Sequence, residues 1–85
     1  MKNFFEIKVV LKTSKDVKDF CFTTADLPRT LSVKAAHGDF IVDGRSILGM
    51  LSLNLSEPIT IVFESSISFD TDKIQKMFYP WIVEI

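Results

Sequence analysis

Several features of secreted, metal-binding and nucleic-acid-binding proteins are missing from this sequence. It has one cysteine, Cys21, so no disulfide can form within the chain, and the apolar run DFCF around it suits a buried thiol. Ten Lys and Arg against eleven Asp and Glu leave a formal net charge of -1, which provides no attraction to a phosphate backbone. The sequence therefore predicts a protein of a reducing cytoplasm that binds no nucleic acid.

Metal ligands and long apolar runs are also scarce. The single histidine, His37, and the single cysteine stand among scattered acids without the spacing of a metal site. The opening residues MKNFFEIKVVLK carry a charge every few positions, unlike the apolar core of a signal peptide or a membrane span. We expect no metal, no cofactor, no membrane insertion and a cytoplasmic location.

The composition that remains is that of one globular domain. Of the 85 residues, 47% are hydrophobic and 25% are charged, which argues against disorder. Single-core domains usually contain about 50–200 residues, so the chain has room for one core. Residues 1–85 are predicted to form a single domain without a linker or a repeat.

Apolar periodicity divides the chain into seven elements. Alternating apolar and polar residues predict strands, and apolar residues at helical spacing predict helices. The expected strands cover residues 4–11, 30–35, 40–42 and 58–65. Helices are expected after Thr13 or Ser14, after Ser46, and after Asp70 or Thr71, and Pro80 should end or kink the last one. The order β-α-β-β-α-β-α predicts an α+β fold, with one mainly antiparallel sheet and its helices on one face.

The segment DGRSILGMLSLNL, followed by PITIVFES, resembles HPr, the histidine-containing phosphocarrier of the bacterial sugar phosphotransferase system. In that family a basic residue and a serine introduce a short helix of the type K-S-I-M-G-V-M-S-L-G, and a strand follows. The resemblance is close over residues 45–53 and weaker over the rest of the chain. It implies an open-faced β-sandwich, with a four-stranded sheet and three helices on one face.

The chemistry of that family is absent from the corresponding positions. HPr carries its phosphate on the histidine of a G-L-H-x-R-P motif, which in this register falls on TSKDVKD. Lys15 occupies the phosphohistidine position, and Val17 occupies the arginine position. A protonated lysine is a poor nucleophile near neutral pH, so ordinary phosphocarrier activity and enzymatic activity are not expected.

Ser46 and the residues around it give the remaining indication of a function in this sequence. As a structural residue, Ser46 caps the second helix; in the family, the corresponding serine is phosphorylated by the ATP-dependent HPr kinase. If Met50 and Leu53 face the sheet, helical spacing places other apolar side chains outward, where the family docks partner proteins. The predicted docking residues are Arg45, Ile47, Leu48 and Leu51.

Three functions fit these observations. The first is a noncatalytic regulatory or protein-binding module, similar to the catabolite-repression HPr paralogues, whose partner is an HPr kinase or a regulator that docks on the second helix. The second is a phosphocarrier of altered chemistry that uses His37, although a histidine in a hairpin turn is more simply a solvent-facing residue. The third is a diverged scaffold domain that is not phosphorylated at all.

Overall fold

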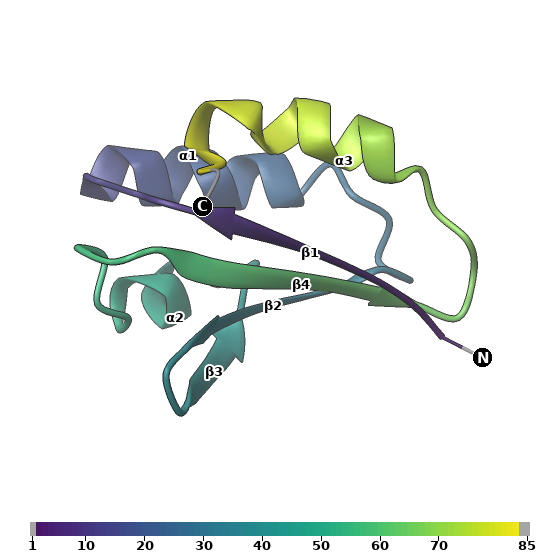
Figure 1. Ribbon diagram of the computed structural model, residues 1–85. Helices are drawn as coiled ribbons and strands as arrows, with labels where there is room; N and C mark the ends of the chain where they lie inside the picture. The colour runs from purple at the N-terminus through teal and green to yellow at the C-terminus, as the bar shows by residue number, and fades with distance from the viewer. Residues whose placement is uncertain (1, 84–85) are drawn as a thin grey trace.

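The computed structural model describes residues 2–83 and has the predicted order of elements. The strands are β1 (Asn3–Val9), β2 (Ser32–His37), β3 (Phe40–Asp43) and β4 (Ile59–Ser65). The helices are α1 (Ser14–Thr24), α2 (Ile47–Leu51) and α3 (Thr71–Phe78), and a 3-10 turn (Tyr79–Trp81) follows α3. Within this part of the chain the protein is an α+β domain of the expected class (Figure 1).

The strands form one antiparallel sheet in the order β1-β4-β2-β3. Its register places Ile7 opposite Ile61 and Ile61 opposite Ala35, so three neighbouring strands present small or branched side chains to the same face. The β2–β3 hairpin turns at Gly38, whose φ of 59° lies in the left-handed region that glycine adopts without a steric cost. This topology agrees with the open-faced sandwich that the resemblance to HPr implies.

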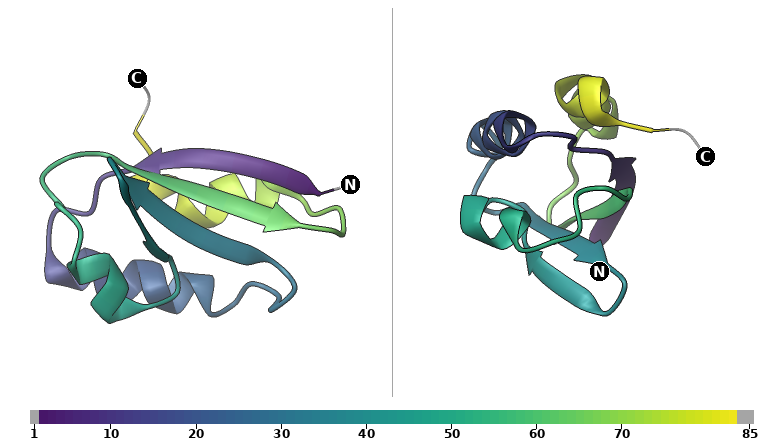
Figure 2. Two further views of the ribbon diagram at one scale, coloured as in Figure 1. Left: turned by 90° about the horizontal axis from the view of Figure 1, so that it is seen from below. Right: turned by 90° about the vertical axis from the view of Figure 1, so that its left-hand side faces the viewer.

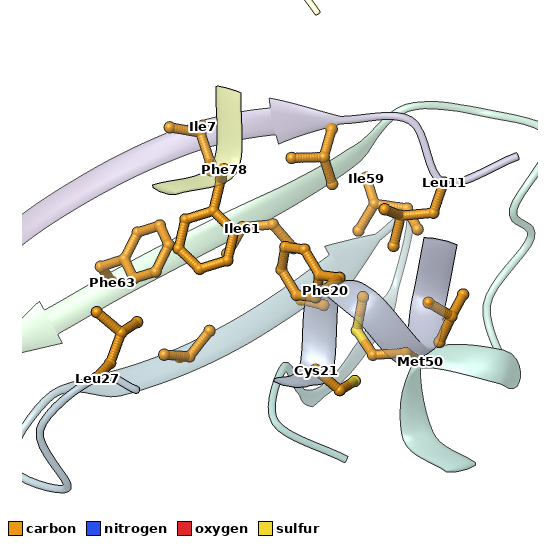
Figure 3. Packing of buried hydrophobic residues seen from close by; sticks show 14 of the residues in the cluster. Ile7, Leu11, Phe20, Cys21, Leu27, Met50, Ile59, Ile61, Phe63 and Phe78 are labelled. Carbon is orange, nitrogen blue, oxygen red and sulfur yellow. The ribbon is translucent and has the colours of Figure 1, made fainter. Parts of the chain in front are cut away.

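The helices cover one face of the sheet, and the opposite face is open. α3 lies across β1 and β4, α1 lies beside it on the side of β2 and β3, and α2 packs against α1 and β3 (Figures 1 and 2). Phe20 of α1, Phe63 of β4 and Phe78 of α3 meet in the core, where each is fully buried (Figure 3). The ring centroids of Phe20 and Phe78 are 5.0 Å apart, and those of Phe63 and Phe78 are 5.6 Å apart. Such aromatic pairs stabilise the core beyond the area they bury.

The start of α1 follows the capping pattern read from the sequence. Thr13 Oγ1 accepts a hydrogen bond from the Asp16 amide at 3.1 Å, and the Asp16 carboxylate accepts one from the Lys12 amide at 3.0 Å. These bonds satisfy the amide of Asp16, which the helix itself leaves without a partner, and the amide of Lys12, which lies just before the cap. Val17, Phe20, Cys21 and Thr24 are buried on one face, as their spacing predicts.

The end of α3 is set by Pro80. The helix stops at Phe78, and Pro80 lies in the 3-10 turn that follows, because proline cannot donate the backbone bond that would continue an α-helix. The chain then returns to β1: Val9 and Ile82 form an antiparallel bridge, and the Val83 amide donates to the Lys8 carbonyl at 2.9 Å. Residues 82–83 therefore cover part of the free edge of β1, a pairing that the sequence did not predict.

The strand boundaries differ from the prediction mainly at the end of β1, which stops at Val9 rather than residue 11, and at both ends of β2. The strand begins at Ser32 rather than residue 30, because the chain turns first: the Leu31 amide donates to the Pro28 carbonyl at 3.0 Å. It also continues to His37, which pairs with Phe40 and leaves a two-residue turn. His37 is thus a strand residue, whereas the sequence placed it in the turn.

Candidate functional site

The approach to α2 is a tight turn that leads directly out of β3. The Asp43 carboxylate accepts a hydrogen bond from the Arg45 amide at 2.9 Å, and the Asp43 carbonyl accepts one from the Ser46 amide at 3.1 Å. A Cβ on Gly44 would lie 2.7 Å from Cγ1 of Val33, so the close approach of the turn to β2 requires glycine. These contacts fix the point at which α2 begins.

Ser46 caps α2, as predicted. Its Oγ accepts a hydrogen bond from the Gly49 amide at 3.1 Å, and its side chain is half-buried. A Cβ on Gly49 would lie 3.3 Å from the Ser46 Cβ and 3.4 Å from the Val42 Cβ, so a larger residue would be crowded where α2 contacts β3. The hydroxyl of Ser46 therefore has a structural role in the unmodified protein.

The two faces of α2 differ sharply in exposure. Met50 is fully buried and Leu53, just after the helix, is 7% exposed, whereas Leu48 is 82% exposed and Leu51 is 42% exposed. Ile47 departs from the expected outward position, because it is half-buried and packs against the core. The outward apolar surface of α2, which we call the α2 patch, consists of Leu48 and Leu51.

Arg45 lies beside Ser46 in sequence, but its guanidinium is directed to another part of the molecule. Nη1 donates to the Thr24 carbonyl at 2.6 Å, and Nη2 donates to the carbonyls of Pro28 and Leu31 at 2.8 Å each. Arg45 therefore holds the end of α1 and the loop that follows it. Its predicted role in partner binding would require the guanidinium to leave these carbonyls.

The position of the family's phosphohistidine lies in the first turn of α1. Lys15 is highly exposed, and its ammonium contacts the Asp19 carboxylate at 2.7 Å. This hydrogen bond, together with the charge of Asp19, raises the pKa of Lys15 above its ordinary value and keeps the amine protonated. Val17, at the arginine position, is fully buried and contributes to the core.

His37 contacts a residue that is distant in sequence. Its Nε2 lies 2.8 Å from a carboxylate oxygen of Glu57, in the loop between α2 and β4, and its side chain is 22% exposed. The sequence predicted a solvent-facing histidine in the turn, whereas His37 is a partly buried strand residue that contacts Glu57. The contact links the β2–β3 hairpin to the loop that leads into β4.

Cys21 is buried beneath the turn that leads into α2. Its Sγ lies 4.0 Å from the Gly44 carbonyl, and burial, with a smaller contribution from the charge of Asp43, raises the pKa of the thiol. A thiol that stays protonated is a poor nucleophile and a poor metal ligand. Within residues 2–83, no three His, Cys, Asp or Glu side chains gather in a way that would hold a metal ion.

Comparison of the chain with known protein families, with curated proteins and with solved structures finds no match. In residues 2–83, no helix has the length and apolar character needed to cross a membrane. The basis for a function is therefore the geometry around α2 and the resemblance of residues 45–53 to HPr.

Proposed function

We propose that the protein is a noncatalytic, HPr-like regulatory module that binds a protein partner through the α2 patch and is switched by phosphorylation of Ser46. The observation that carries this proposal is the exposure of Leu48 and Leu51 on the helix that Ser46 caps. Two exposed leucines on a helix that begins at a modifiable hydroxyl give one short segment both a docking surface and a control point.

The start of α1 favours a noncatalytic role over that of a phosphocarrier. Lys15 is held protonated by Asp19, and the carboxylate of Asp16 already occupies the N-terminal turn of α1, where it would repel a phosphate. His37 contacts Glu57, and no arginine lies next to it in sequence. Neither Lys15 nor His37 is therefore arranged like the family's phosphohistidine, which supports a noncatalytic role.

The position of Arg45 determines how a phosphate on Ser46 would act. A phosphoserine carries about -1.5 to -2 charges at neutral pH. Because the Arg45 guanidinium is bound to three carbonyls, its charge is directed away from Ser46. The added charge would stand at the edge of the α2 patch and would be neutralised best by an Arg or Lys of the partner.

The experiment is incubation of the full chain with HPr kinase and ATP, followed by measurement of the intact mass. We expect the mass of one phosphate to be added, and the addition to disappear in Ser46→Ala. The matched control is Ser52→Ala, which removes the other serine hydroxyl of α2, at its C-terminal end, where it donates to the Gly49 carbonyl at 2.6 Å. This variant should be phosphorylated like the wild type.

Docking is tested separately with Leu48→Asp. Leu48 is exposed, so this variant should keep the melting temperature of the wild type but be phosphorylated more slowly, because the kinase loses its apolar contact. If Ser46 receives no phosphate, the switch is excluded. If the rate for Leu48→Asp equals that of the wild type, the α2 patch does not dock the kinase.

A further inference from the structure

A pocket of about 280 Å³ lies between the loop that follows α1 and the loop that precedes α3. The end of β4 and the first turn of α3 complete its wall, and no residue of α2 lines it. We call this space the loop pocket. It is separate from the α2 patch and plays no part in the proposed switch.

The floor of the loop pocket is apolar. Leu27, Leu31 and Ile74 line it and are at most 7% exposed, whereas Ile67 lines it and is 60% exposed. Benzene binds in an engineered apolar cavity of about 150 Å³, so the loop pocket has room for an aromatic ring and a short chain attached to it. Its apolar floor suits such a group.

Hydrogen bonds hold the walls of the pocket in place. On one side, the carbonyls of Pro28 and Leu31 both accept from Arg45. On the other side, the Ser65 hydroxyl accepts from the Ile67 amide at 3.1 Å, and the Asp70 carboxylate accepts from the Lys73 amide at 3.1 Å. A pocket whose loops are already fixed loses less conformational entropy when a ligand binds.

The charged groups that line the pocket have an excess of one negative charge. Asp26 contributes a carboxylate from the loop after α1, Asp70 contributes another from the loop before α3, and Lys73 contributes one ammonium. Asp26 and Asp70 are exposed. This balance favours a ligand that carries one positive charge.

We propose that the loop pocket binds small amphipathic amines, which consist of one ammonium group on a short aromatic or branched aliphatic body. The apolar body enters against Leu27, Leu31 and Ile74. The ammonium stays at the rim and pairs with the carboxylates of Asp26 and Asp70.

The test is an NMR titration of the full, isotope-labelled chain with three probes of nearly equal size: phenethylamine, 2-phenylethanol and phenylacetate. We expect saturable amide shifts at Leu31, Ile67 and Lys73. The amine should bind about two- to fivefold more tightly than the alcohol, which is the gain expected from an exposed ion pair, and phenylacetate should bind most weakly.

Two variants test the charge without damaging the fold. Asp26→Asn and Asp70→Asn should each reduce the preference for the amine over the alcohol, and asparagine at position 70 still caps α3. Asp39→Asn, in the β2–β3 turn, is the control and should leave the preference unchanged. Ser68→Phe, which fills the pocket from an exposed position, should weaken all three probes.

Either of two results would overturn the proposal. One is the absence of saturable shifts at the pocket with any probe. The other is binding of phenylacetate as tight as that of phenethylamine, which would show that the carboxylates do not select the ligand.

Discussion

Arg45 illustrates how a single side chain can join parts of the chain that are distant in sequence. Its three acceptors, the carbonyls of Thr24, Pro28 and Leu31, lie 14 to 21 residues before it. They belong to the end of α1 and to the loop before β2, where backbone carbonyls have no helical partner. The guanidinium supplies donors to all of them from one fixed, planar group.

Replacing Arg45 by methionine keeps most of the apolar stem but leaves these carbonyls without a charged donor. We expect Arg45→Met to lower the free energy of unfolding by about 2–3 kcal/mol, measured by urea denaturation. Arg29→Met is the matched control, because Arg29 is exposed, and it should change stability by less than about 0.5 kcal/mol. Equal stability of the two variants would contradict the structural role of Arg45.

The sequence could not have revealed this role of Arg45. Its position directly before Ser46 suggests a cation for a phosphate or a partner, and nothing in the local pattern points to residues 24–31. The contact depends on how the β3–α2 turn packs against α1. By contrast, local bonds such as the Ser46 cap follow from residue types three positions apart, so the sequence does predict them.

α2 provides a direct comparison of a buried and an exposed position within one short helix. Met50→Ala should cost about 2–5 kcal/mol of unfolding free energy, because Met50 is fully buried and its loss leaves a cavity. Leu48→Ala should change stability by less than about 0.5 kcal/mol, because the leucine is mostly in solvent. Urea denaturation of both variants checks this; similar losses would show that the α2 patch is part of the core.

At the scale of the elements, helical spacing predicted which side chains are buried and which are exposed at most positions of α2. The burial of Met50 and Leu53 and the exposure of Leu48 and Leu51 agree with a 3.6-residue period. Ile47 did not follow the prediction of an outward position. It stands three residues before Met50, so the same period places it beside that buried side chain, where it packs against the core.

At the scale of the whole molecule, the thiol of Cys21 makes the free energy of unfolding depend on pH in the alkaline range. Its pKa in the folded protein is raised above the ordinary value of 9.0, so the folded state holds the thiol proton more tightly than the unfolded state does. The resulting stability is fully present below pH 9.0 and is lost as the pH rises through the folded pKa. Other groups also titrate there, so a variant without the thiol is needed.

We therefore compare the wild type with Cys21→Ala by urea denaturation at several pH values. The alanine variant should be less stable at neutral pH, because it leaves a small cavity, but its stability should fall less steeply above pH 9.0. Parallel curves for the two proteins would mean that the thiol of Cys21 has the same pKa in the folded and unfolded states.

The order of the elements could be predicted from the sequence because each element carried its own signal, whereas the open-faced sandwich was implied by the resemblance to HPr. Alternation marked β1 and β4, and Pro80 marked the end of α3. The contact between His37 and Glu57 and the return of Ile82 to β1 had no such signal, since each joins segments through side-chain placement or a single bridge. The loop pocket was missed for the same reason.

The pairing of β1 has a consequence for the order in which the protein takes shape during synthesis. A ribosome makes residues 3–9 well before residues 59–65 and Ile82, which are their strand partners. The β2–β3 hairpin, whose strands are neighbours in sequence, can form while these later residues are still missing. Until β4 emerges, β1 and its apolar side chains have no sheet to join, and the nascent chain exposes a segment that is prone to aggregate.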